Sequence, residues 1–381
     1  MNIYVAFYYL SAILMLLVSF IPLIIYLMYG REPKISYSTN YEVDLPTDDP
    51  PAIVNAICSG FSKKVGEPDM NGFIATIMDL IDRNYLILSN KTHDGKYNSP
   101  GSLFLEINPD YDPDTLWDFE VGVLNFLQEY EQNSIISMDL VSESLHYYNS
   151  ADFFKETYKN WKNEVKQTLL TNGSLKEAFL RKGDKYIKIF GITGLVLSIV
   201  VSYVVLSDFW ALTFTIVYLF FIYSAFLKTK DTRTIIFGIE GLIIVAWYLF
   251  EIISGSLLSV KILFLSSLVL GVISMVSLML PEKIAGQWTN YGREYYAKWH
   301  SFKRYIEDYS LIKEYSPESV NVWNRYLVYA TALGVADEVE NAMKFSIPYD
   351  QLRGSDLYSF HYYNSPTAML KNALDAALEL D

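Results

Sequence analysis

Five long apolar segments constrain this chain more than any other feature of its sequence. They cover residues 3–29, 187–206, 209–227, 234–253 and 260–280. A helix needs about 20 consecutive, mostly apolar residues to cross the hydrocarbon core of a bilayer, and each segment comes near that length or exceeds it. We therefore predict a multi-pass α-helical membrane protein with five spans. An anchor, a polar block, a four-helix bundle and a second polar block would follow one another, at residues 1–30, 31–186, 187–281 and 282–381.

The first segment is typical of an uncleaved anchor. A secretory signal begins with a basic stretch and carries a short apolar core, whereas residues 1–9 hold no Lys or Arg and the apolar run is longer than a signal needs. The run ends in the polar flank Arg31-Glu32-Pro33-Lys34. We expect Pro22 to kink this span, which membrane helices tolerate.

Basic residues flank the five segments on one side only. Short cytoplasmic loops carry an excess of Lys and Arg. All the basic flanks fall on one side if the N-terminus lies outside, and they contain Arg31, Lys34, Lys182, Lys185, Lys188, Lys228, Lys230, Arg233 and Lys283. We therefore predict a cell-membrane protein with its N-terminus outside, and with its C-terminus and both polar blocks in the cytoplasm. Lys261, near the outer end of the last span, is the exception and can extend to the interface.

The first polar block has the order of elements of a winged helix. Asp49 and the prolines that follow it predict a helix start, and Gly60 closes that helix. A second helix at 72–83 and strands at 85–89 and 103–107 follow, with a polar loop between the strands. We expect a cytoplasmic α+β, winged-helix-like body, completed by helices of the C-terminal block.

The charge of this block disfavours DNA. Residues 31–186 contain 25 acidic and 15 basic side chains, and the whole chain has a formal charge of −13. Because Lys and Arg contacts to phosphates supply most non-specific affinity for nucleic acid, we expect no nucleic-acid partner. A membrane-tethered winged-helix regulator remains an alternative function.

The sequence contains none of the common catalytic signatures. It lacks a P-loop, a dinucleotide fingerprint, an HExxH motif and a nucleophile elbow. Cys58 is the only cysteine, and no two of the four histidines are spaced as i, i+4. We expect no catalytic residues, no metal site, no cofactor and no enzymatic activity.

One acidic residue lies inside a predicted span. Glu240 falls in the fourth segment, and Trp247 and Glu251 follow on the same helix face. Ionisable groups within the bilayer are functional candidates by default, which keeps a small transporter or channel component using Glu240 as an alternative. An interfacial position, or pairing with Lys230 or Arg233, is the structural alternative.

Small residues mark one face of the second and fifth spans. The second span carries Gly191, Gly194, Ser198 and Ser202, and the fifth carries Ser267, Gly271, Ser274 and Ser277. Because small side chains let helices approach closely in lipid, we predict close helix contacts within a packed four-helix membrane bundle.

The C-terminal block is rich in aromatic residues. Four of them are candidates for binding a partner, namely Trp299, Phe302, Trp323 and Tyr326. The helix at 286–309 either lies near the membrane surface or docks onto the first polar block.

Six stretches of the chain resemble the cytoplasmic part of the DUF2207 family of predicted prokaryotic membrane proteins. They are REPK, LPTDDPPA, FIATIMDL, RNYL, AKWHSFK and WNRYLVYATALGVA, at residues 31–34, 45–52, 73–80, 83–86, 297–303 and 323–336. The resemblance implies membrane location and this architecture, and it implies no activity. Such proteins carry an extracytoplasmic β-rich domain before the first span, but here the span begins at residue 3. We expect a short member of the family, or a separate chain that supplies the ectodomain as a partner.

These patterns together favour a membrane-anchored interaction or scaffold protein. Its expected partners are the lipid bilayer and cytoplasmic or membrane proteins that contact the acidic cytoplasmic body.

Overall fold

The computed structural model of the chain is helix-rich, with two small sheets. It describes residues 3–58, 65–89, 103–171, 178–206, 257–308, 311–312, 319–362 and 366–379. The chain forms two compact units, each assembled from segments that are distant in sequence. Unit 1 comprises Met1–Glu32 and Leu180–Gln287, and unit 2 comprises Pro33–Phe179 and Trp288–Asp381.

Unit 1 holds the apolar helices. Its elements are α1 (Ile3–Val18), α2 (Ile21–Ile25), the π-helical turn η1 (Tyr26–Gly30), α9 (Lys182–Leu206), α12 (Leu258–Met279) and α13 (Glu282–Ala285). Three helical stretches are long and apolar enough to cross a membrane, at Ile3–Gly30, Lys182–Val205 and Leu258–Met279. They correspond to the first, second and fifth predicted spans. The predicted spans at 209–227 and 234–253 lie outside the described residues.

The first span bends where Pro22 falls. Pro22 has no N–H to donate to the carbonyl of Val18, and a proline in a helix interior removes one hydrogen bond of the ladder. The helix accordingly breaks between α1 and α2. The Phe20 N–H bonds to the Leu17 carbonyl at 3.1 Å, one residue closer than an α-helix requires.

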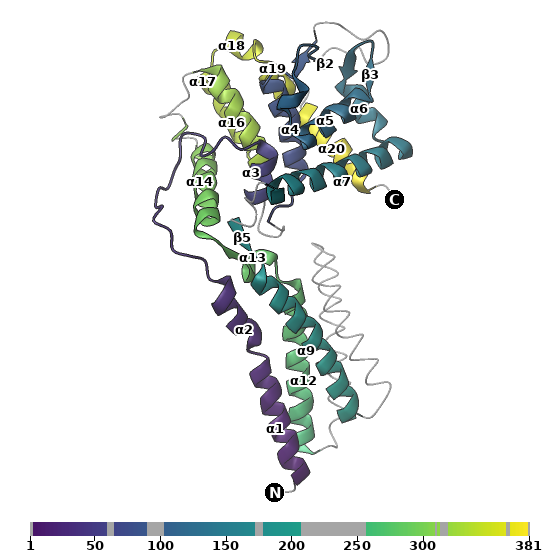
Figure 1. Cartoon of the computed structure of the whole chain (residues 1–381), viewed down its shortest axis with the longest axis vertical. Helices are drawn as coiled ribbons and strands as arrows, with labels where there is room; N and C mark the ends of the chain where they lie inside the picture. Colours follow the sequence, from purple (N-terminus) through teal and green to yellow (C-terminus); the bar gives the residue numbers. More distant parts are fainter. Residues whose placement is uncertain are drawn as a thin grey trace. The chain divides into compact units, whose positions relative to one another are not determined.

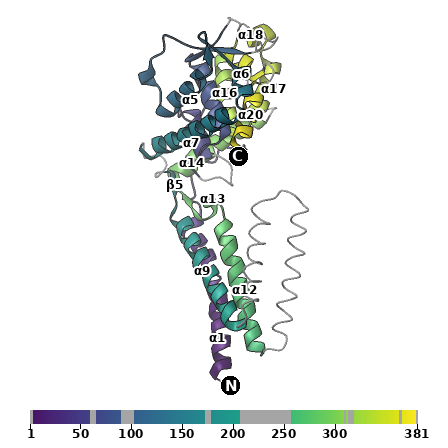
Figure 2. The ribbon, with the colours of Figure 1, turned by 90° about the vertical axis from the view of Figure 1, so that its right-hand side faces the viewer.

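The small-residue faces of α9 and α12 pack against each other, and this is the close helix contact expected of small side chains. The two helices lie side by side in both ribbon views (Figures 1 and 2). The Ser198 hydroxyl donates to the Ser267 carbonyl at 2.6 Å. A Cβ on Gly194 would collide with the Ser274 hydroxyl. The close approach of α9 to α12 therefore requires a glycine, with no side chain, at position 194.

The first polar block provides the sheet of unit 2 and the helices around it. Its elements are α3 (Pro51–Cys58), α4 (Met70–Asp82), β1 (Leu86–Leu88), β2 (Phe104–Ile107), η2 (Pro113–Thr115), α5 (Asp118–Gln128), β3 (Glu131–Gln132), β4 (Ile135–Ser137), α6 (Met138–Ser144) and α7 (Tyr148–Thr171). The sheet is antiparallel, with the strand order β1-β2-β4-β3. Leu86 lies opposite Ile107, and Phe104 lies opposite Ser137. The predicted sequence of two helices and two strands is therefore present, and β4 joins it as a further strand.

The C-terminal block is helical. It contains α14 (Asn290–Glu307), α16 (Val320–Leu333), α17 (Ala336–Ser346), α18 (Tyr349–Arg353), α19 (Asp356–Tyr362) and α20 (Pro366–Glu379). A two-stranded sheet of β5 (Phe179–Leu180) and β6 (Gln287–Trp288) lies where the chain passes from one unit to the other. Gly334 ends α16 in the left-handed conformation, with φ of 74°, which a glycine adopts without steric cost.

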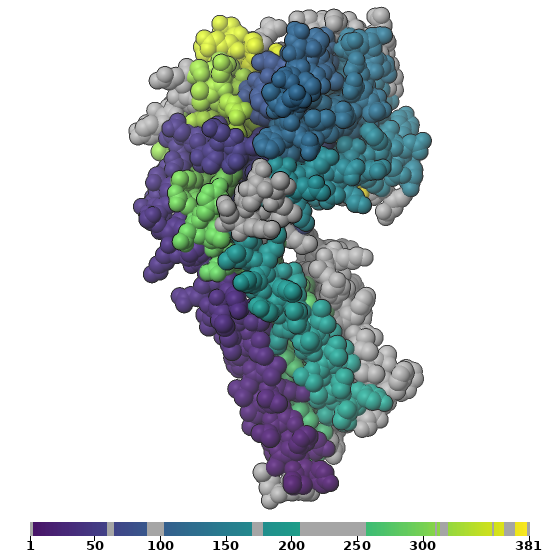
Figure 3. Space-filling view, in the orientation of Figure 1, coloured from purple at the N-terminus to yellow at the C-terminus, as the bar shows by residue number. Residues whose placement is uncertain are grey.

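Both polar blocks share one hydrophobic core. Phe73 and Trp161 from the first block belong to the same buried cluster as Trp299 and Trp323 from the C-terminal block. Helix α16 packs on α4, and α20 packs on α7, as both ribbon views show (Figures 1 and 2). In the space-filling view, the blue surface of the first block directly borders the green and yellow surface of the C-terminal helices (Figure 3). Unit 2 therefore needs both blocks for its core.

Candidate functional site

The pairing of α4 with α16 places a polar site at each end of the pair. The Asn55 side chain, beside the first turn of α4, donates to the carbonyl of Ala332 in the last turn of α16 at 2.8 Å. At the other end, Arg325 near the start of α16 donates to Asp79 near the end of α4 at 2.7 Å. The two helices therefore run antiparallel. A cavity lies at the first end, and an open groove lies at the second.

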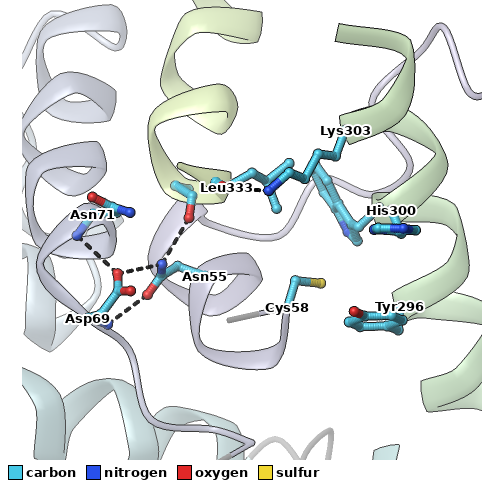
Figure 4. Close-up of a pocket in the computed structure, with 10 residues that line it drawn as sticks. Asn55, Cys58, Asp69, Asn71, Tyr296, His300, Lys303 and Leu333 are labelled. Carbon is cyan, nitrogen blue, oxygen red and sulfur yellow. Dashed lines mark hydrogen bonds between the residues drawn. The ribbon is translucent and has the colours of Figure 1, made fainter. Parts of the chain in front are cut away.

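The cavity has a volume of about 330 Å³ and carries mixed chemistry. Its walls come from α3, the start of α4, α14 and the end of α16, and are formed by Asn55, Cys58, Asp69, Asn71, Tyr296, Trp299, His300, Lys303, Ala332 and Leu333. Figure 4 shows the amides and the carboxylate on one side, and Tyr296 and His300 on the other. Cys58 extends between the two sides (Figure 4).

A buried asparagine organises the amide side of the cavity. Asn55 donates to Asp69 Oδ1 at 2.8 Å and accepts from the Asp69 backbone N–H at 2.8 Å. The same carboxylate caps α4 by accepting from the N–H groups of Asn71 and Gly72, as N-cap residues do. A Cβ on Gly72 would lie 2.6 Å from Asn55 Oδ1. This wall therefore depends on close approach between α3 and α4.

The opposite wall comes from α14. The ring of Tyr296 stacks on His300 at 5.8 Å between centroids. Partial burial, reinforced by the charges of Arg304 and Lys303, lowers the pKa of His300 below its usual value of 6.5. The imidazole is therefore uncharged at neutral pH, and one of its ring nitrogens can accept a hydrogen bond. Lys303 donates to the Leu333 carbonyl at 3.1 Å, which ties α14 to the end of α16.

The groove is larger and more open, with a volume of about 760 Å³. Its lining is dominated by amide, hydroxyl and charged side chains and consists of Ile81, Asp82, Asn84, Val320, Asn321, Asn324, Arg325, Gln351, Gly354, Ser355, Asp356 and Leu357. The Ser355 hydroxyl donates to Asn324 Oδ1 at 2.8 Å, which links the α18–α19 turn to α16.

An ion network lies beneath the groove. Asp79 contacts Arg325 at 2.7 Å and Arg83 at 2.8 Å. Arg83 also contacts Glu120 at 2.5 Å. Burial raises the pKa of Glu120 and of Asp82, although neighbouring arginines oppose the shift. The carboxylates are therefore held by arginine contacts and hold the first block and α16 together.

The two sites suit different ligands. Side-chain amides and hydroxyls both donate and accept hydrogen bonds, so the groove can satisfy the alternating N–H and C=O groups of a peptide. The cavity is smaller than most pockets for drug-sized ligands, and its thiol, imidazole, phenol and ammonium groups suit a small polar molecule.

The four aromatic residues expected to bind a partner lie in the core. Trp299 and Phe302 are 0% exposed, Trp323 is 1% exposed and Tyr326 is 3% exposed. The Tyr326 hydroxyl donates to the backbone carbonyl of Val43. Their apolar area is thus buried within unit 2, and of the two alternatives for α14 the structure shows docking onto the first block. Glu240, Trp247 and Glu251 lie outside the described residues.

Trp299, one of the four aromatic candidates, forms part of the cavity wall, but the sequence patterns did not single out Asn55 or the residues that line the groove. Asn55 sits in the otherwise apolar run Pro51–Cys58, and a lone amide in such a run was the available signal. The groove joins residues from 81–84, 320–325 and 351–357, which no local pattern connects.

The sequence from 38 to 343 matches a family described as "Predicted membrane protein (DUF2207) C-terminal domain". Comparison with curated proteins and with solved structures gave no match.

Proposed function

Because the chain belongs to the DUF2207 family of predicted membrane proteins, we propose that it is a membrane-anchored interaction protein. In this proposal unit 2 is an acidic cytoplasmic body that binds protein partners and has no enzymatic activity. The observation that carries it is the open polar groove beside α16. Peptide recognition needs paired donors and acceptors on an accessible surface, and the groove offers Asn321 and Gln351, both exposed.

The groove also carries opposite charges that can fix the register of a bound segment. Arg325 contacts Asp82 at 3.3 Å, and Asp356 is exposed on the same lining. A polar partner segment with charged side chains would therefore be oriented as well as held, since complementary charges set specificity more than affinity.

Site-specific photo-crosslinking in native membranes tests this proposal. A photoreactive amino acid would replace Asn321 or Gln351 in the groove, and Lys159 on the exposed face of α7 would serve as the matched control. We expect a reproducible crosslinked protein at the two groove positions and not at the control. No band at either groove position, or the same bands at all three, would overturn the proposal.

The finer topology is part of the proposal. Five spans, an outside N-terminus and a cytoplasmic C-terminus are supported by the basic flanks and by the three candidate spans. With Cys58 replaced by serine, a single cysteine would be placed at Ser256, on the proposed outside, or at Lys283, on the proposed inside. An impermeant maleimide should label only the Ser256 position in intact cells. Labelling only of the cysteine placed at position 283 would show that the orientation is the opposite of the one proposed.

We also propose that the first block is winged-helix-like without binding DNA. The order α3, α4, β1, β2, with β4 paired to β2, supports the winged-helix-like fold. In such a fold the helix before the first wing strand, here α4, would have to enter the major groove. Every residue of α4 from 72 to 81 is buried, so this helix has no free face for DNA, which supports the absence of DNA binding. A salt-dependent mobility shift of duplex DNA by the purified full chain would contradict it.

A further inference from the structure

A mixed cluster of metal-ligand side chains lies on α17 and α19, apart from the cavity and the groove lining. Asp337 and Glu340 are one helical turn apart on α17, so their carboxylates share a face. His361 comes from the last turn of α19. One ligand atom from each of the three residues lies within 4.8 Å of the other two.

The distances suit a shared ion. His361 Nε2 lies 3.1 Å from Glu340 Oε2. Two ligands bound to one tetrahedral zinc at its usual bond lengths lie about 3.3 Å apart. Binding at this pair therefore needs almost no movement, and Asp337, which is exposed, can complete the set by a side-chain rotation.

The arrangement of charges also suits a divalent cation. Lys344 pairs with Glu340 Oε1, while His361 faces the other oxygen, Oε2. A cation bound at Oε2 would thus leave the lysine pair in place. The two carboxylates supply a charge of −2, of which the Lys344 ammonium offsets one, so the ligand set keeps a net negative charge that favours a cation.

We propose that Asp337, Glu340 and His361 bind a divalent first-row transition ion, of which Zn²⁺ is the best-suited probe. An imidazole nitrogen with carboxylate oxygens favours Zn²⁺ and its neighbours over Mg²⁺, which prefers oxygen ligands alone. His361 is 7% exposed, so the ring is held by its surroundings. The ion would crosslink α17 to α19. The inference is independent of the peptide-binding proposal.

Zinc titration of the purified full chain in detergent, against a competing chromogenic chelator, tests the site. We expect one equivalent of Zn²⁺ per chain, a Tm raised by Zn²⁺ because the ion binds only the folded state, and no response to Mg²⁺ at the same concentration. Glu340→Gln and His361→Ala should each weaken zinc binding at least about tenfold. Loss of a residue that only supports a metal ligand already weakens binding by about this factor, and these two residues are ligands themselves.

Two further variants keep the test decisive. Asp337→Asn changes an exposed residue, so it should weaken zinc binding without disturbing the fold even if His361→Ala unfolds. His146→Ala, which removes an exposed histidine on another part of unit 2, should leave binding unchanged. The proposal fails if the wild-type chain binds no zinc, or if one equivalent still binds after all three ligand substitutions.

Discussion

Asn55 and Asp69 hydrogen-bond each other twice, through the Asn55 Nδ2 to the carboxylate and through the Asp69 backbone N–H to Asn55 Oδ1, both at 2.8 Å. The same Nδ2 donates to the carbonyl of Ala332. One buried amide thereby joins α3, the N-cap of α4 and the last turn of α16.

Asn55→Ala should lower the stability of unit 2. It leaves the Asp69 N–H and the Ala332 carbonyl without their partner, and each buried group left unsatisfied costs about 1–3 kcal/mol. Thermal unfolding of the full chain in detergent measures the loss. Asn163→Ala, on the exposed face of α7, is the matched control and should change stability by less than about 0.5 kcal/mol. Equal effects of the two substitutions would contradict this role.

Arg325→Met should destabilise the chain by about 2 kcal/mol. Removal of one partner of a fully buried pair costs about 3–5 kcal/mol, but the Arg325 side chain is 32% exposed, so water screens part of the charge left on Asp79. Adding Asp79→Asn should recover part of the loss, which a double-mutant cycle measures. Arg304→Met, at an exposed position of α14, is the control. Strict additivity of the two changes would show that the pair does not interact.

Gly194→Ala should loosen the packing of α9 on α12. The new Cβ would collide with the Ser274 hydroxyl, and overpacking costs about 1–3 kcal/mol. Ser274→Gly in the same chain should restore most of the Tm, because it removes the colliding atoms. Val196→Leu, at a position 54% exposed on the same helix, should leave the Tm unchanged. Lack of rescue by Ser274→Gly would exclude this contact as the cause.

Glu120 should make stability depend on pH. Its side chain is 1% exposed, and burial raises its pKa above the usual 4.5 even though Arg83 opposes the shift. The folded state therefore holds this proton more tightly than the unfolded state, so its contribution is complete below pH 4.5 and is lost as pH rises through the raised pKa.

Glu120→Gln removes that titration while keeping an acceptor for the Trp117 N–H. The free energy of unfolding of the wild type, relative to the variant, should fall as the pH rises from about 4.5. Unfolding curves at several pH values measure the difference. A difference that is constant, or that rises with pH, would place the pKa of Glu120 at or below its ordinary value.

Local patterns anticipated several parts of the structure. Apolar length located the three candidate spans because a bilayer demands about 20 apolar residues from any helix that crosses it. Pro22 predicted the break between α1 and α2, since a proline lacks the N–H that the ladder needs. The expected positions of two helices and two strands in the first block agree with α3, α4, β1 and β2 to within a few residues, because apolar periodicity and turn residues act over short stretches of chain.

Those local patterns could not predict which helices pack against each other. An aromatic-rich helix has the same sequence pattern whether its rings face a partner or a core. Only the packing of α14 and α16 within unit 2 decides that Trp299 and Trp323 are buried. His361 forms a cluster with Asp337 and Glu340 because two helices meet, although the histidine spacings in the sequence predicted no metal site.

The sequence by itself determined that the chain belongs in a membrane and where its three described apolar stretches lie, because these depend on residues within a few positions of each other. Tertiary structure alone decided that the aromatic side chains of α14 and α16 are buried in the core shared by residues 33–179 and 288–381, that Asn55 reaches Ala332, and where the cavity, the groove and the α17–α19 cluster lie. The Asn55–Ala332 contact, the cavity and the groove join residues more than two hundred positions apart, and the cluster joins two separate helices. The loop-closure entropy of such contacts is offset only when the whole core forms.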